Sequence, residues 1–285
     1  MPVEVWTTFD EQTFTASHVV SDPATGRAAI IDSVLDYDAA SGRTATTSAD
    51  KIIKYVKTKG LTVDWVLETH AHADHLTAAP YLKASLGGRT GVGAGIVKTQ
   101  KAFGAIYNMN GSHQPAARDF DHLFDDEETF ALGDIEARVL HTPGHTPACV
   151  TYVIGDAAFV GDTLFMPDFG TARCDFPGGD ARTLYKSIQR LFALPDETRL
   201  FMCHDYKAPG RDVYAWQTSV AEERANNIHL SDGEDAFVDM RTRRDATLSM
   251  PKLLLPSVQV NIRAGALPPA EENGVAYLKI PLNGV

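Results

Sequence analysis

Three histidines and one aspartate occur within six consecutive residues, directly after an apolar stretch, and no other feature constrains the chain as strongly. Residues 63–67 are typical of a buried strand, and they are followed by His70, His72, Asp74 and His75. A loop at the end of a strand can turn several nitrogen and oxygen donors towards one point. Histidine and aspartate together suit a borderline transition metal such as zinc or iron. The spacing therefore predicts a metal site at the end of this strand.

Three further donors follow apolar, strand-like stretches later in the chain. His145 comes after a Thr-Pro-Gly turn, Asp162 directly follows a glycine, and His204 follows the apolar residues 199–203. Taken singly, each is better explained as a hydrogen-bonded core histidine or a capping aspartate. Taken together with the first four donors, and always placed after a predicted strand, they favour a metalloenzyme whose site is built at strand ends.

The composition excludes several classes of protein. The chain has 285 residues, of which 44% are hydrophobic and 22% charged, as in an ordinary globular protein. A formal net charge of −11 disfavours nucleic acid and anionic membranes as partners. The N-terminus lacks the features of a signal peptide, and no apolar stretch approaches the roughly 20 residues of a membrane span. Three widely spaced cysteines favour free thiols, so we expect a cytoplasmic protein.

Strand-like and helix-like segments alternate through both halves of the chain. Residues 27–32 and 63–69 are predicted strands, whereas residues 78–86 and 96–107 have the pattern of helices. Since each half is rich in strands and carries its own helices, we predict a four-layer αββα sandwich. We expect residues 1–285 to form one domain, because no linker-like segment divides them.

Two segments are expected to lie outside the regular structure. Residues 108–128 are polar and irregular, which predicts a long loop, and long loops in compact domains are often functional. Residues 251–285 are rich in proline, which predicts an extended tail lying over the domain.

The seven donors resemble the ligand set of the metallo-β-lactamase superfamily, and the resemblance covers about residues 10–210. It implies that superfamily's αββα fold. It leaves the substrate open, because the same ligands serve lactamases, lactonases, glyoxalase II and nucleases. The surrounding residues look like the persulfide dioxygenase branch of the superfamily. The stretches that carry this likeness are DTLF at 162–165, GTARCDF at 170–176, TLYKSI at 183–188 and HDYK at 204–207.

The resemblance implies an enzyme that oxidises glutathione persulfide with O₂ and water to sulfite and glutathione. It also implies one Fe(II) per chain, held by His70, His145 and Asp162. Two histidines and one carboxylate leave three positions of an octahedron open, as in non-haem iron oxygenases. The remaining donors would then orient the ligands or hydrogen-bond water and substrate, and these are His72, Asp74, His75 and His204.

Five further residues are candidates on the strength of their charge or position. Arg173 and Asp175 form a pair that either braces the metal loop or is purely structural. Tyr206, Lys207 and Arg263 are predicted to hold the carboxylates of glutathione, since cationic side chains suit such anions. An ordinary solvated surface charge is the alternative for Lys207 and Arg263.

A binuclear zinc hydrolase of glutathione thioesters or lactones, similar to glyoxalase II, is the main alternative. It would hold two zinc ions, with Asp162 bridging them and a metal-bound hydroxide as the nucleophile. The short C-terminus disfavours this reading, because glyoxalase II carries a longer helical C-terminal domain. A protein that only binds a partner and keeps a vestigial site is the third reading. A homodimer stays open as the oligomeric state.

Overall fold

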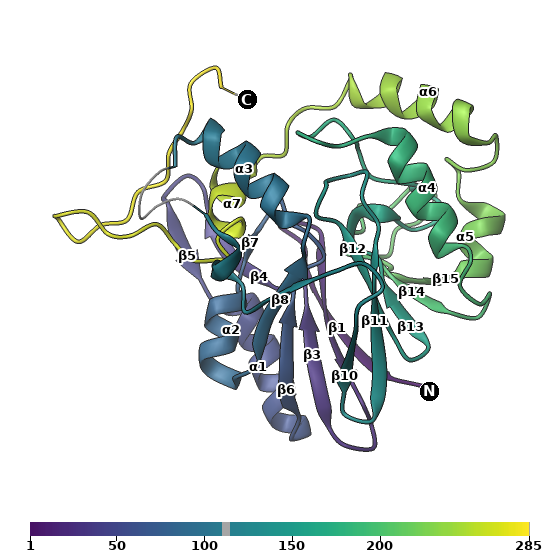
Figure 1. Ribbon diagram of the computed structural model, residues 1–285, viewed down its shortest axis with the longest axis horizontal. Coiled ribbons are helices and arrows are strands. Elements are labelled where there is room, and N and C mark those ends of the chain that lie inside the picture. The colour runs from purple at the N-terminus through teal and green to yellow at the C-terminus, as the bar shows by residue number, and fades with distance from the viewer. Residues whose placement is uncertain (110–114, 285) are drawn as a thin grey trace.

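The computed structural model describes residues 1–109 and 115–284, and two six-stranded sheets packed face to face form its centre (Figure 1). The first sheet runs, in spatial order, through β1 (Glu4–Asp10), β2 (Thr15–Ser21), β3 (Arg27–Ile31), β6 (Thr62–Leu67), β8 (Arg89–Gly93) and β9 (His122–Phe124). The second runs through β10 (Thr129–Leu132), β11 (Ile135–His141), β12 (Val150–Ile154), β13 (Ala157–Phe159), β14 (Arg199–Phe201) and β15 (Gln217–Ser219). A small sheet joins β5 (Arg43–Ala45), β4 (Val34–Asp38) and β7 (Leu76–Thr77).

Helices cover the outer face of each large sheet. The first sheet is covered by α1 (Thr47–Lys59) and α2 (Ala79–Leu86), and the second by α4 (Ala181–Leu191), α5 (Val220–Asn226) and α6 (Glu234–Asp245). Two more helices, α3 (Ile96–Ile106) and α7 (Leu254–Asn261), lie at one end of the sandwich (Figure 1). The predicted αββα sandwich is therefore confirmed. No helix within the described ranges is long and apolar enough to span a membrane.

Alternation along the strands separates an inner core from an outer one. In β3, Ala29 and Ile31 pack in the core between the two sheets, whereas Ala28 and Ile30 pack against the helices. Successive strand residues point to opposite faces, so one strand supplies both layers. Since both faces of β3 are covered, its sequence is a continuous apolar run rather than an alternating one.

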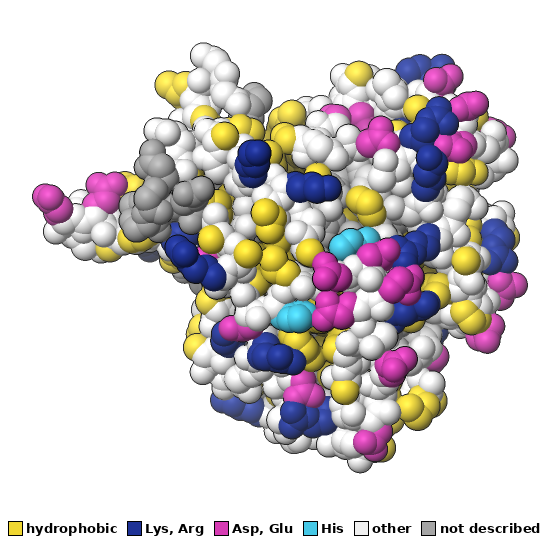
Figure 2. Space-filling view, viewed as in Figure 1, with side chains coloured by type: hydrophobic (Ala, Val, Ile, Leu, Met, Phe, Trp, Pro, Cys, Tyr) yellow, Lys and Arg dark blue, Asp and Glu magenta, His cyan; other side chains and the backbone are white. Residues whose placement is uncertain are grey.

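The predicted extended tail at residues 251–285 is wrong in its first part, which contains α7. Leu254, Val258 and Ile262 recur every four residues and are buried, which is the pattern of one helical face. Pro256 lies in the first turn, where a missing backbone N–H costs little, so the proline content concealed a helix. Only the segment after α7 is largely exposed, and it projects from the body at the left of the space-filling view (Figure 2).

The predicted irregular loop at residues 108–128 is also only partly correct. Residues 110–114 lie outside the described residues. After them come a 3₁₀ turn, η2 (Ala117–Asp119), and then β9, which pairs in parallel with β8 at the edge of the first sheet. Phe124 of β9 is completely buried in the core between the sheets. A three-residue strand is too short to show a clear periodicity in sequence, which explains why the prediction missed it.

Candidate metal centre

The predicted donors come from four loops that meet at one end of the two sheets. The HxHxDH stretch follows β6 in the first sheet, while His145 and His204 follow β11 and β14 in the second. Asp162 was expected directly at the end of a strand. Instead β13 ends at Phe159, and Asp162 lies in a short 3₁₀ turn, η3 (Gly161–Thr163). Gly161 has φ +52, and a Cβ there would come within 2.5 Å of Thr69, so glycine lets these two loops approach each other.

His70, His145 and Asp162 form the first group of possible ligands, and their donor atoms all lie within 4.8 Å of one another. Asp162 Oδ2 is 3.9 Å from His70 Nε2 and 3.5 Å from His145 Nε2. His145 Nδ1 lies 2.8 Å from the carbonyl oxygen of Arg173, and His70 Nδ1 lies 3.0 Å from Thr69 Oγ1. Both rings can therefore donate a proton through Nδ1, which leaves Nε2 free to bind a metal.

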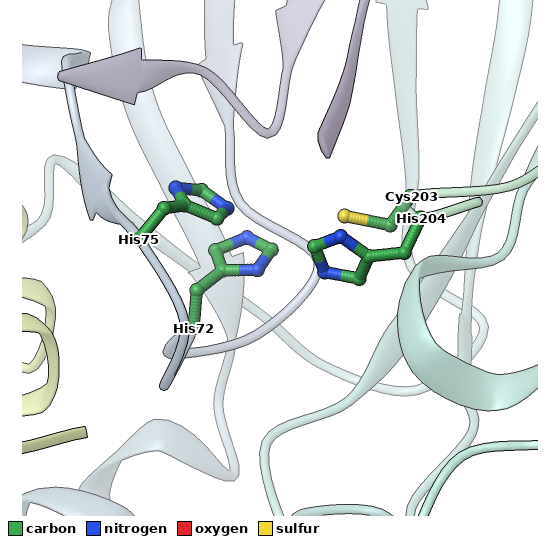
Figure 3. A group of neighbouring side chains, drawn as sticks. All are labelled: His72, His75, Cys203 and His204. Atoms are coloured by element: carbon green, nitrogen blue, oxygen red, sulfur yellow. The ribbon is translucent and has the colours of Figure 1, made fainter. Parts of the chain in front are cut away.

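His72, His75, Cys203 and His204 form the second group, again with donor atoms within 4.8 Å (Figure 3). His72 and His75 come from the loop after β6, and Cys203 and His204 reach the group from the opposite side (Figure 3). Asp74 lies at the edge of this group, with Oδ2 3.3 Å from His204 Nε2. The sequence predicted Cys203 only as a free thiol. It is free and buried, and burial raises its pKa well above the ordinary value.

The outer nitrogens of His75 and His204 are hydrogen-bonded to the backbone. His75 Nδ1 is 3.2 Å from the carbonyl oxygen of Leu76, and His204 Nδ1 is 3.2 Å from that of Phe14. Like His70 and His145, both rings therefore present Nε2 to the centre. Burial lowers the pKa of His75 to about 4, and it lowers the pKa of His70 well below its ordinary value. Neutral imidazoles are the form that binds metals.

His72 is oriented the other way round. Its Nε2 lies 3.0 Å from Asp32 Oδ1 and 3.3 Å from Glu68 Oε2, and these three residues form a third group. Burial lowers the pKa of His72, but the two carboxylates together raise it well above the ordinary value. Asp32 also accepts hydrogen bonds from the backbone N–H and hydroxyl of Thr69. We did not predict roles for Asp32 and Glu68, and only their positions beside predicted strand ends hinted at them.

The donors of the first two groups fit a metal ion. Six donor atoms are buried and have no hydrogen-bond partner among the described residues, and buried polar atoms are rarely left in that state. These atoms are His70 Nε2, His72 Nδ1, Asp74 Oδ2, His75 Nε2, Asp162 Oδ1 and His204 Nε2. Asp162 lies between the groups, because its Oδ1 is 3.4 Å from His204 Nε2 while its Oδ2 faces the first group. A metal in either group would satisfy atoms that otherwise remain unpaired.

Arg173 and Asp175 form a bidentate ion pair beside the first group. The guanidinium of Arg173 donates to the two carboxylate oxygens at 2.6 and 2.7 Å, and also to the carbonyl oxygen of Ser249 at 2.7 Å. The hydrogen bond to Asp175 raises the pKa of Arg173. The carbonyl oxygen of Arg173 faces His145, so the pair belongs to the segment that contacts this histidine, and its bracing role remains a prediction.

A cavity of about 870 Å³ opens onto both groups. Tyr206, predicted to bind substrate, lies in its wall. Asp74, His75, His145 and Asp162 reach the cavity from the metal groups. Four phenylalanines, Phe14, Phe165, Phe169 and Phe176, contribute to the apolar part of the wall, together with aliphatic side chains such as Leu248. The cavity can therefore hold a substrate of peptide size with its reacting end at the metal groups.

Two of the predicted substrate-binding residues are not in this wall. Lys207 instead lies with Nζ 4.3 Å from the ring centre of Tyr214, and Arg263 follows α7, so their binding roles remain predictions. Arg244 and Lys252 line the cavity, and neither forms an ion pair with any residue in the described ranges. We missed these two cations because they lie in α6 and in the supposed tail.

Comparison with known proteins places these features in a family. The family described as the metallo-beta-lactamase superfamily matches residues 12–204. A protein of Burkholderia pseudomallei described as a probable metallo-hydrolase is 54% identical, over 97% of this chain and 98% of that protein. Glyoxylase B2 of Dictyostelium discoideum is 50% identical, over 94% of this chain and 93% of that protein. The mitochondrial persulfide dioxygenase ETHE1 of Bos taurus is 29% identical, over 94% of this chain and 91% of that protein.

A solved structure agrees with the sequence comparisons. The crystal structure of ETHE1 from Myxococcus xanthus superposes with a TM-score of 0.73 and 29% sequence identity. The superposition covers 93% of this chain and all of that one. The fold and the family match agree, and the chain belongs to the metallo-beta-lactamase superfamily.

Proposed function

We propose that this enzyme is a persulfide dioxygenase, which oxidises glutathione persulfide with O₂ and water to sulfite and glutathione. The observation that carries the proposal is the composition of the first group, which contains two histidines and one carboxylate. A metal site with three histidine ligands would need His72 beside His70 and His145. His72 belongs instead to the second and third groups. Two histidines and one carboxylate are the ligand set of non-haem Fe(II) oxygenases.

The names of the similar proteins point to two different reactions. The persulfide dioxygenase of Bos taurus aligns over nearly the whole chain, and the solved structure that shares the name ETHE1 superposes over nearly all of it. The relatives at 50–54% identity, however, have names that point to hydrolysis. The names of the more similar relatives thus favour the hydrolase, and the composition of the first group favours the dioxygenase.

In the proposed reaction the outer sulfur of the persulfide is oxidised and the sulfur–sulfur bond is broken. Both atoms of O₂ are reduced into the sulfite, water supplies its third oxygen, and glutathione leaves as the thiol. Bound iron would supply neighbouring open positions for O₂ and the persulfide sulfur. His70, His145 and Asp162 would hold that iron.

The chain itself positions the substrate and protects the reacting sulfur. The aromatic wall of the cavity, including Phe165 and Phe176, limits the access of water and of competing thiols to the metal groups. Arg244 and Lys252 offer positive charge to the carboxylates of a peptide substrate. Asp74 lines the cavity and can hydrogen-bond bound water or substrate, and His204 lies behind it with Nε2 3.3 Å from Asp74 Oδ2.

The test measures O₂ uptake and sulfite release with glutathione persulfide, together with the metal content of protein purified without added metal. We expect stoichiometric O₂ uptake, sulfite as the product, and about one iron per chain. Hydrolysis of S-lactoylglutathione is measured on the same preparation. Rapid hydrolysis without O₂ uptake on persulfide would refute the dioxygenase.

A binuclear metallo-hydrolase of glutathione thioesters or lactones is the second candidate. The observation that favours it is the position of Asp162, whose two oxygens face the first and second groups separately, as a bridging ligand would. In that case Asp74, His75 and His204 would hold a second metal, and a bound hydroxide would be the nucleophile. Two zinc ions per chain, with thioesterase activity, are its expected signature.

A further inference from the structure

One side chain from the C-terminal helix is hydrogen-bonded to the backbone of the metal-ligand loop. Asn261, the last residue of α7, donates through Nδ2 to the carbonyl oxygens of His72 at 2.8 Å and His75 at 2.7 Å. Its Oδ1 accepts from the backbone N–H of Thr77 at 2.9 Å. The amide therefore makes three bonds to a segment of six residues that lies more than 180 positions earlier in the chain.

These bonds enclose the part of the loop that carries Asp74 and His75. Within this part of the loop the carboxylate of Asp74 and Nε2 of His75 face the second group, so the bonds of Asn261 tie its backbone to α7. Asn261 is only 3% exposed, so water does not replace its hydrogen bonds. An unsatisfied buried carbonyl or N–H is costly, which makes the loop conformation depend on this amide.

The end of α7 is held tightly against the loop. Gly265 has φ +85, and a Cβ there would come within 2.6 Å of Pro80 and 2.8 Å of Thr77. On the other side, Gln100 of α3 donates to the carbonyl oxygen of Ile262 at 2.9 Å. Since α7 lies beside β7 (Figure 1), the backbone that carries Asn261 is packed in a fixed position next to the loop.

A chain of contacts continues from this loop to the third group. The hydroxyl of Thr77 donates to Glu68, and Glu68 in turn faces His72 Nε2 at 3.3 Å. Asn261 thus fixes the backbone of His72 on one side, while Glu68 and Asp32 fix its ring on the other.

We propose that Asn261 is a positioning residue for the metal centre, and that α7 holds residues 72–77 in the conformation that binds metal. This role rests on the presence of a metal in either group. It does not depend on whether the enzyme is a dioxygenase or a hydrolase. The positioning role of Asn261 and the proposed dioxygenase function can therefore be refuted independently of each other.

The test uses Asn261→Leu and Asn261→Asp in the full chain. The leucine removes all three bonds, whereas the aspartate keeps an acceptor for Thr77 and loses both donors. Gln259→Leu is the matched control. Gln259 is an amide in the same helix, is 1% exposed, and bonds to Leu255 and Lys279 instead of the metal loop.

Each variant is loaded with Co(II), and the rate of Co(II) loss to a chelator and the visible spectrum of the bound Co(II) are measured. We expect both Asn261 variants to lose Co(II) about 10–100-fold faster and to show a changed spectrum, as for lost contacts to ligand residues. Gln259→Leu should lose thermal stability but keep the wild-type spectrum and release rate.

Two results would overturn the role of Asn261. One is wild-type release and spectrum in a folded Asn261 variant. The other is a Gln259→Leu protein that loses Co(II) as fast as the Asn261 variants, because α7 would then act only through general stability. Far-ultraviolet circular dichroism before loading confirms that each variant is folded.

Discussion

The first and second metal groups use the same kinds of side chain, yet their surroundings differ. In the first group, His70 and His145 present Nε2 to one carboxylate, Asp162. In the second group, His72 has its Nε2 bound to two buried carboxylates, and the thiol of Cys203 replaces a carboxylate among the neighbouring donors. Residue type alone therefore does not distinguish the two groups. They differ in the carboxylates that face Nε2 of His72 and in the buried thiol of Cys203.

Removing a first-group ligand should have the largest effect. We expect His70→Ala and Asp162→Ala to lose their iron almost completely, and turnover with it, because two remaining protein ligands hold a labile Fe(II) poorly. Elemental analysis and O₂ uptake check this. If either variant kept the wild-type iron content, the first group would not be the primary metal site. The second group would then be the better candidate.

The second group should respond less. If it orients water and substrate without holding a metal, His204→Ala keeps close to one iron per chain and loses about 10–100-fold in activity. In a binuclear enzyme the wild type carries two metals, and His204→Ala loses one of them. Metal per chain in these two proteins separates the alternatives, and a fall from two to one would contradict the dioxygenase.

Arg173→Ala tests whether the ion pair beside the first group stabilises that group. The substitution removes the bidentate pair with Asp175 and the bond to Ser249. We expect a loss of about 1–2 kcal/mol in the free energy of unfolding, since the pair is partly exposed. Activity should fall while iron remains bound. Asp175→Asn weakens the same pair from the other side, and an unchanged melting temperature and turnover in both variants would exclude both the bracing and the structural role.

Cys203→Ala should have the smallest effect. Cys203 belongs to the second group, whereas the iron of the proposed dioxygenase would be held by His70, His145 and Asp162 of the first group. We expect unchanged iron content and a loss of about 1 kcal/mol in stability from the small cavity. Loss of a bound metal in this variant would show that the thiol is a ligand. The second group would then be a metal site as well as the first.

The sequence was sufficient for the features that depend on local spacing. The HxHxDH stretch, the later donors at strand ends and the two strand-rich halves predicted the sandwich and the convergence of seven side chains. The structure brings these seven together, and their roles as ligands remain predictions. The patterns that predict burial and alternation span only a few consecutive residues. These features can therefore be predicted from the sequence alone.

The features that the sequence did not reveal all depend on contacts between distant segments. Nothing near His72 shows that its ring will meet Asp32, which is 40 positions away. Asn261 and its loop are still further apart, and the prolines around it suggested an extended tail. Arg244 and Lys252 enter the cavity wall only because α6 and the segment after it fold back over the second sheet.

The origin of the ligands in both sheets has a consequence for folding. His70 is carried by a loop of the first sheet, and His145, Asp162 and His204 by loops of the second, so neither half can form the site alone. Contacts of such large sequence separation form late, after the loops between them have closed. High-affinity metal uptake should therefore mark the final docking of the two sheets. A chain that stalls before this step would take up little metal, although its helices and hairpins were already in place.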